Sequence, residues 1–220
     1  MADDRKEGSR IAMNSEALAR IRQNRAVFIL RSNQSVDLEG WIRTAVENGA
    51  RCLEITLPTP GALPAIARAR RQYPNLLIGG GTVLTTDEVA ALSDAGAEFA
   101  VSPHFDPAIV DACRKRGLAC IPGVCTPTEM VAAWRAGATA LKLFPAPASE
   151  VVRALRAPLP ELPLVAVGGV SRENLRGFLD AGCVAVGVGG SVFAVKLTLA
   201  EIGRRVAELV QLAQSAPPTY

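Results

Sequence analysis

The sequence contains only one histidine, His104, among its 220 residues. Imidazole is a common ligand of zinc and other transition metals, so this scarcity excludes a metal site built from several histidines. Carboxylates alone would have to hold any ion. The five cysteines are an odd number without a C-x-x-C pair, and Cys52 and Cys120 lie in apolar, strand-like runs. This pattern predicts reduced, mostly buried thiols and neither a disulfide framework nor a zinc site.

Long apolar runs are also missing. No segment has the roughly 18 consecutive apolar residues that a membrane span needs, and residues 1–10 have no apolar stretch resembling a signal peptide. We therefore expect a cytoplasmic protein without a membrane partner. Lys and Arg number 24 against 21 Asp and Glu, a formal net charge of +3. Part of the excess lies near the N-terminus, where a solvated leader and one exposed helix face explain it better than a nucleic-acid-binding surface.

Aromatic residues make up only 5% of the chain, whereas hydrophobic residues as a whole make up 49%. Small and branched apolar residues suit closely packed layers of helices and strands better than a sandwich filled with aromatic rings. The composition therefore favours an α/β protein with a large core. The length by itself allows one large domain or two small ones.

Short apolar runs rich in Val, Ile and Leu recur at nearly even intervals, and amphipathic segments lie between them. The runs are Ala26–Arg31, Cys52–Leu57, Leu76–Thr82, Phe99–Pro103, Leu118–Val124, Ala140–Pro145, Leu162–Gly169 and Val184–Gly190. The segments that predict helices include Leu38–Asn48, Asp87–Ala95, Pro107–Arg116, Pro127–Ala136 and Arg172–Ala181. The repeating unit is therefore a strand followed by a helix.

Residues at the predicted helix ends agree with this pattern. Capping-box spacing occurs at Thr85 with Glu88 and at Thr126 with Glu129, and Asp106-Pro107 is suited to the start of a helix. Glycines follow five helical patterns, where a left-handed residue ends a helix: Gly49, Gly96, Gly117, Gly137 and Gly182.

Eight such units without a linker favour a single (β/α)8 TIM barrel with an extra N-terminal helix. The alternative, an open doubly wound sheet, lacks its G-x-G-x-x-G fingerprint after the first strand. We expect the barrel over residues 15–215, a disordered or flexible leader over 1–14 and a tail over 216–220.

A barrel of this type carries its chemistry at the carboxyl ends of the strands. Strand alternation places Lys142 on one face with Phe144, and Leu141 and Leu143 on the other. The leucines belong against the helices, so the lysine is expected to point inward. Burial lowers a lysine pKa and makes the amine a nucleophile for a ketone. Binding of a phosphate or pairing with a carboxylate is the alternative role.

Glu54 lies on the same face of its strand as Thr56, opposite Leu53, Ile55 and Leu57. A carboxylate rarely enters a strand interior without a partner, and Lys142 is the natural one. The pair is either an acid/base carboxylate beside a lysine amine or a purely structural ion pair.

Glycines follow the last two predicted strands, at Gly168-Gly169 and at Gly189-Gly190-Ser191. The phosphate site of many barrels is built from the loops after strands seven and eight, where glycine lets backbone N–H groups approach the oxygens. These positions predict a phosphate site, with turn glycines that bind nothing as the alternative.

Several segments, taken in order, resemble the 2-keto-3-deoxy-6-phosphogluconate (KDPG) aldolases and their phosphogalactonate relatives. The segments are Leu53–Leu57, Gly79–Leu84, Ser102-Pro103, Ile121–Gly123, Leu141–Ala146, Gly168–Val170 and Gly190-Ser191. The resemblance runs from about Ala17 to about Phe193. It implies a class I aldolase that forms a homotrimer and needs neither a metal nor another cofactor. Its partners would be pyruvate and a small sugar-acid phosphate.

The resemblance also implies a role for each matching position. Lys142 would form the Schiff base and Glu54 would be the acid/base group. The pyruvate pocket would be shaped by Thr82, Pro103 and Phe144, and the phosphate would be held by Gly168, Gly169, Gly190 and Ser191. The implied reaction is reversible cleavage of a KDPG-type acid to pyruvate and glyceraldehyde 3-phosphate. Phosphogalactonate or 4-hydroxy-2-oxoglutarate cleavage is the alternative.

Two positions depart from the family pattern. Pro58 stands where many phosphogluconate aldolases have an arginine for the substrate carboxylate, and His104 stands where glycine is common. Arg31, in an Ile-Leu-Arg segment similar to the phosphogalactonate relatives, could supply the missing cation, with an arginine at the rim in solvent as the alternative. Three other classes stay open. A phosphate-binding barrel isomerase or synthase would use the glycines alone, and a metal-dependent aldolase is disfavoured by the single histidine. The departure at Pro58 also allows a sugar-acid binding protein without activity.

Overall fold

The structure, a computed structural model, describes residues 16–215. The leader predicted for residues 1–14 and the tail predicted for 216–220 lie outside the described residues.

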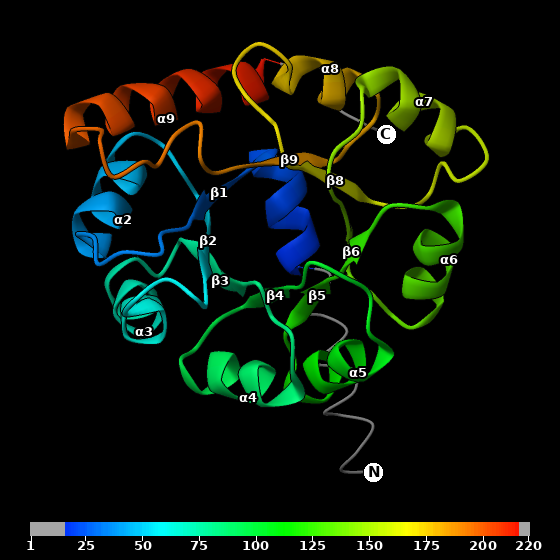
Figure 1. The fold of residues 1–220 in the computed structure, drawn as a ribbon, viewed down its shortest axis with the longest axis horizontal. Coiled ribbons are helices and arrows are strands. Elements are labelled where there is room, and N and C mark those ends of the chain that lie inside the picture. Colours follow the sequence, from blue (N-terminus) through cyan, green and yellow to red (C-terminus); the bar gives the residue numbers. More distant parts are fainter. Residues whose placement is uncertain (1–15, 216–220) are drawn as a thin grey trace.

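The described strands form one parallel sheet that curls into a barrel, as predicted (Figure 1). The strands are β1 (Ala26–Leu30), β2 (Cys52–Thr56), β3 (Leu77–Gly81), β4 (Phe99–Val101), β5 (Ala119–Ile121), β6 (Gly123–Val124), β7 (Leu141–Leu143), β8 (Leu164–Val167) and β9 (Ala185–Val188). Their order is β5-β4-β3-β2-β1-β9-β8-β7-β6.

The strands β5 and β6 are two halves of one predicted run. Pro122 separates them, since proline has no backbone N–H to donate to a sheet. The Pro122 carbonyl still accepts a hydrogen bond from the Lys142 N–H, at 2.9 Å. The two ends of the strand order are therefore joined through one continuous segment, and the barrel is nearly closed.

Helices follow the strands and cover the outside of the barrel (Figure 1). They are α2 (Leu38–Glu47), α3 (Ala62–Gln72), α4 (Thr86–Asp94), α5 (Pro107–Arg116), α6 (Pro127–Arg135), α7 (Ser149–Arg156), α8 (Leu175–Asp180) and α9 (Leu199–Gln214). None of the helices within residues 16–215 is long and apolar enough to cross a membrane.

The predicted helix signals are confirmed. Both capping boxes form, at Thr85 and Thr126, and all five glycines predicted at helix ends adopt positive φ. Most predicted helix boundaries agree to within one residue, and the largest difference is at α8, which begins at Leu175 where the prediction began it at Arg172. The Asn174 side chain accepts from the Ser171 N–H and donates to the Gly169 carbonyl, both at 2.8 Å. These bonds hold the segment as a turn and delay the helix.

Residues 16–24 form the expected extra helix before β1, seen in blue in the middle of the barrel in Figure 1. Ala17 and Ile21 pack with residues that begin the strands, such as Cys52 and Leu77. Arg20 donates to the Glu98 carboxylate at 2.9 Å and to the Asn75 carbonyl at 3.1 Å. The helix therefore seals the end of the barrel where the strands begin, which leaves the opposite end open for a site.

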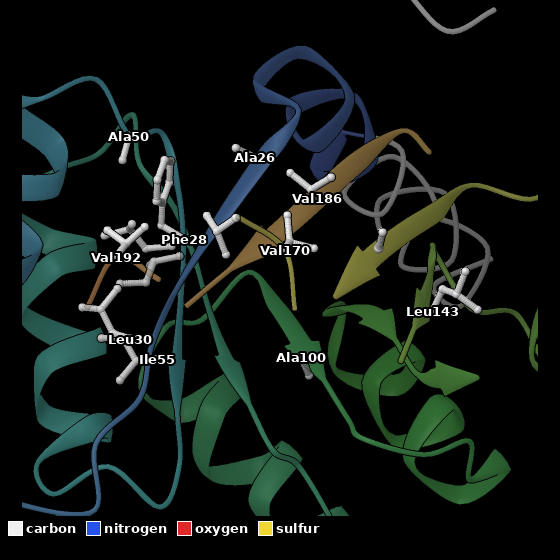
Figure 2. Packing of buried hydrophobic residues seen from close by; sticks show 14 of the residues in the cluster. Ala26, Phe28, Leu30, Ala50, Ile55, Ala100, Leu143, Val170, Val186 and Val192 are labelled. Carbon is white, nitrogen blue, oxygen red and sulfur yellow. The ribbon is translucent and has the colours of Figure 1, made fainter. Parts of the chain in front are cut away.

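The apolar core has two layers. The larger lies between the strands and the helices, and Figure 2 shows part of it around Phe28, Leu30 and Ile55. The smaller fills the barrel interior with residues such as Val27 and Val165. Because alternate residues of a strand point to opposite faces, every second position is directed into one layer and the next into the other.

Candidate active site

A cavity of about 410 Å³ lies where strands β1, β2, β7, β8 and β9 end. Eight of the ten residues predicted for the site line it: Arg31, Glu54, Lys142, Phe144, Gly168, Gly169, Gly190 and Ser191. Thr82 and Pro103 are not among its lining residues, although Thr82 contacts one of them. Residues predicted from five separate strand ends therefore meet in one space.

Lys142 enters the cavity from the middle of β7. Its neighbours Leu141 and Leu143 belong to the layer under the helices, so alternation turns the lysine inward as predicted. The side chain is buried, and its Nζ lies 4.7 Å from the centre of the Phe144 ring. Burial lowers the pKa of Lys142, Glu54 opposes this effect, and the positive charge of Arg31 adds to it. At neutral pH, a larger fraction of Lys142 is therefore in the neutral, nucleophilic amine form than for a lysine in water.

Glu54 lies in the middle of β2 and is also buried. Burial raises the pKa of its carboxyl group, while the cations of Lys142 and Arg31 act in the opposite direction. The two groups influence each other through space, and the interactions of the described residues include no direct hydrogen bond between them. The cavity thus contains one amine and one carboxyl group, each displaced toward its neutral form by burial.

Arg31 follows β1 and reaches across to the end of β3, where its Nη2 donates to Thr82 Oγ1 at 2.8 Å. Thr82 has a φ of 61°, an uncommon conformation for a β-branched residue. Such strain is found most often at functional sites. Pro58, at the family's arginine position, is exposed and lines a different hollow with Leu57 and Thr59. Of the two positions, only Arg31 brings a cation into the cavity.

The glycine loops after β8 and β9 form one wall of the cavity. Gly168 and Gly169 have φ of 99° and 72°, which glycine adopts without strain. The hydroxyl of Ser191 donates to the Val170 carbonyl at 3.1 Å and joins the two loops. In the described part of the chain, the backbone N–H groups of Gly168, Gly169, Gly190 and Ser191 donate to no protein acceptor. These donors are available to an anion.

Some lining residues were not predicted from the sequence, among them Ser171, Val167 and Gly187. Gly187 could have been found, because it lies on the inner face of β9 by alternation. A Cβ there would lie 2.8 Å from the Val167 side chain, so only glycine leaves the cavity open at this point. Val167 precedes the Gly-Gly pair and Ser171 follows it after Val170, and no local pattern marks either as a site residue.

The fold and the cavity define the class of protein: a (β/α)8-barrel enzyme with a buried amine and a buried carboxyl group at the carboxyl ends of its strands. The family model "Aldolase: KDPG and KHG aldolase" matches residues 18–208. The chain belongs to this family of aldolases, which are lyases.

Similar proteins agree with this membership. The chain is 37% identical to the "Probable 2-dehydro-3-deoxy-6-phosphogalactonate aldolase" of Rhizobium meliloti (strain 1021), over 81% of this chain and 86% of the relative. It is 32% identical to the "2-dehydro-3-deoxy-phosphogluconate aldolase" of Haemophilus influenzae, over 90% and 96% of the two chains. A solved structure titled "Native KDPGal structure" has a TM-score of 0.81 at 30% identity, covering 85% of this chain and 93% of that one.

Proposed function

We propose that the protein is a class I aldolase that cleaves a 2-keto-3-deoxy-6-phospho-sugar acid of the KDPG type to pyruvate and glyceraldehyde 3-phosphate. The observation that carries the proposal is the presence of buried Lys142 and buried Glu54 in one cavity. A lysine that attacks a ketone must lose its proton, and burial favours the neutral amine.

The reaction begins when the Lys142 amine adds to the C2 ketone and water leaves, which gives a protonated imine. Glu54 takes the proton from the C4 hydroxyl, directly or through a water. The C3–C4 bond then breaks, its electron pair moves toward the imine, and the aldehyde departs. The remaining enamine takes the proton back at C3 from Glu54. Addition of water to the imine releases pyruvate and restores the lysine.

Arg31 and the glycine loops are suited to the two ends of this substrate. The Arg31 guanidinium, oriented by its hydrogen bond to Thr82, is suited to bind the substrate carboxylate. It takes the place of the cation that Pro58 cannot provide. The unpaired N–H groups at Gly168, Gly169, Gly190 and Ser191 are suited to the phosphate. Phe144 packs beside Lys142, which suits it to shape the pyruvate pocket. We also propose the homotrimer that the family resemblance implies.

Cleavage of 2-keto-3-deoxy-6-phosphogalactonate is the second candidate. It is favoured by the position of Arg31 inside the cavity and of Pro58 outside it, the arrangement expected from the phosphogalactonate relatives. The two substrates differ in configuration at C4, and pyruvate-release rates measured on each will rank them.

Borohydride trapping tests the covalent step. Reduction in the presence of pyruvate should add one stable adduct per chain, and peptide mass spectrometry should locate it at Lys142. Lys142→Arg should abolish both labelling and turnover, since a guanidinium stays protonated. Lys196→Arg, at an exposed lysine, is the matched control and should change neither. Labelling at Lys115 or Lys196 would refute the assignment, and an active but unlabelled enzyme would indicate a non-covalent mechanism.

A further inference from the structure

A second cavity, of about 340 Å³, lies behind the glycine loops. It shares Ser171 and Ser191 with the first cavity, so these two serines form a wall between the spaces. Helix α9 lines its other side through Arg205, Glu208 and Leu209. A residue on this helix can therefore act on the glycine loops from the side that faces away from the substrate.

Arg205 makes such a contact. Its Nη1 donates to the Ser191 carbonyl oxygen at 2.7 Å. A hydrogen bond from a guanidinium is charge-assisted, and it fixes the direction of the peptide group that accepts it. The Ser191 carbonyl is thereby held toward Arg205, while the Ser191 hydroxyl is bonded to Val170 in the neighbouring loop. The N–H of the same peptide group, that of Val192, donates to the Gly189 carbonyl at 2.8 Å, so this part of the loop is held from both sides. The N–H groups of Gly190 and Ser191 donate to no protein acceptor within residues 16–215.

The second cavity is not itself suited to an anion. Its two arginines are accompanied by two glutamates, so its formal charge is balanced. Glu208 lies 3.8 Å from Arg172, and the Glu173 carboxylate accepts from the Ser171 hydroxyl. Of these two arginines, Arg205 is the one that donates a hydrogen bond to a loop of the first cavity within residues 16–215. This geometry favours action on the substrate through the loop.

We propose that Arg205 is a positioning residue that holds the Ser191 loop in the shape that binds a terminal phosphate, and so sets a preference for phosphorylated substrates. The inference rests on the proposed aldolase function. It adds a residue on the last helix to the determinants of substrate choice. Arg205 need not touch the substrate, because it acts through the backbone of Ser191 and through the positive charge behind it.

The experiment compares KM and kcat for 2-keto-3-deoxy-6-phosphogluconate, the corresponding phosphogalactonate and their unphosphorylated forms. Arg205→Met keeps the apolar stem and removes the charge. It should raise KM for the better phosphorylated substrate about 10-fold, with little change in kcat, because a bond to a charged group is lost. KM for the unphosphorylated form, and proton exchange at the pyruvate methyl, should stay unchanged. Arg205→Lys should restore most of the loss, and exposed Arg204→Met is the matched control.

The outcomes separate this inference from the proposed function. An equal rise in KM for phosphorylated and unphosphorylated substrates would show a general structural effect and overturn the role of Arg205. A wild-type enzyme that does not prefer the phosphorylated substrate would overturn it as well. In both cases borohydride trapping of pyruvate at Lys142 would still support the aldolase. A wild-type protein that is neither trapped nor active on any of these acids would overturn both proposals.

Discussion

The Glu54 carboxylate occupies the space that a side chain at Gly81 would fill. A Cβ at Gly81 would overlap Oε1 of Glu54, whose strand β2 pairs directly with β3. The two preceding glycines meet other neighbours, since a Cβ at Gly79 would overlap Phe99 and one at Gly80 would overlap Leu92. The Gly-Gly-Gly run thus makes room for three different groups, and the last of the three glycines makes room for the proposed acid/base residue.

Gly81→Ala should therefore disturb Glu54 directly. We expect a loss of about 1–3 kcal/mol in the free energy of unfolding, the usual cost of overpacking, and slower proton exchange at the pyruvate methyl. Glu54→Ala removes the overlapping group, so the same Gly81→Ala change should cost much less stability in that background. Chemical denaturation of the four proteins of this double-mutant cycle measures the coupling. Equal costs in both backgrounds would show that Glu54 is not the obstacle.

The pH dependence of pyruvate trapping should reveal the environment of Lys142. Its pKa lies below the ordinary lysine value because burial and Arg31 disfavour the ammonium more than Glu54 favours it. The trapping rate should rise with pH as the amine loses its proton. The pH at the midpoint of this rise should lie below about 10.4, the pKa typical of lysine in water.

Two charge variants should move this rising limb in opposite directions. Arg31→Ala removes a cation that lowers the pKa of Lys142, so the limb should move to higher pH. Glu54→Gln removes an anion that raises that pKa, so the limb should move to lower pH, while proton exchange slows by about 10²–10⁴-fold. Shifts in the same direction would contradict the electrostatic account.

The bond between Arg31 and Thr82 provides a test that separates function from stability. Thr82→Gly removes the hydroxyl that orients Arg31 and relieves a positive φ that β-branched residues avoid. We expect KM for pyruvate to rise while the free energy of unfolding stays the same or increases. Steady-state kinetics and denaturant unfolding measure the two quantities.

Arg31→Ala is the matched comparison for this prediction. It should raise the same KM by about 10- to 150-fold, since a charge-assisted bond to a carboxylate is worth about 1.5–3 kcal/mol. An unchanged KM in both variants would mean that the pyruvate carboxylate binds elsewhere in the cavity.

The sequence by itself determined the architecture and the inward residues. Strand alternation is a local property with a period of two, so the direction of Lys142 follows from Leu141 and Leu143 without knowledge of the fold. Capping residues and left-handed glycines are equally local, and the boxes at Thr85 and Thr126 form as their spacing predicts. Because the strand–helix unit recurs eight times, a closed barrel is the favoured way to bury so many apolar strands.

The tertiary structure decided which of these residues contact one another. Arg31 and Thr82 are 51 residues apart, and Arg205 and Ser191 belong to different elements, so these contacts exist only after the barrel has closed. The same holds for the close approach of the Glu54 carboxylate to Gly81 and for the placement of Pro58 outside the cavity. Local patterns specify the direction of a side chain, whereas distances between strands depend on register and closure, which the packing of the whole core sets.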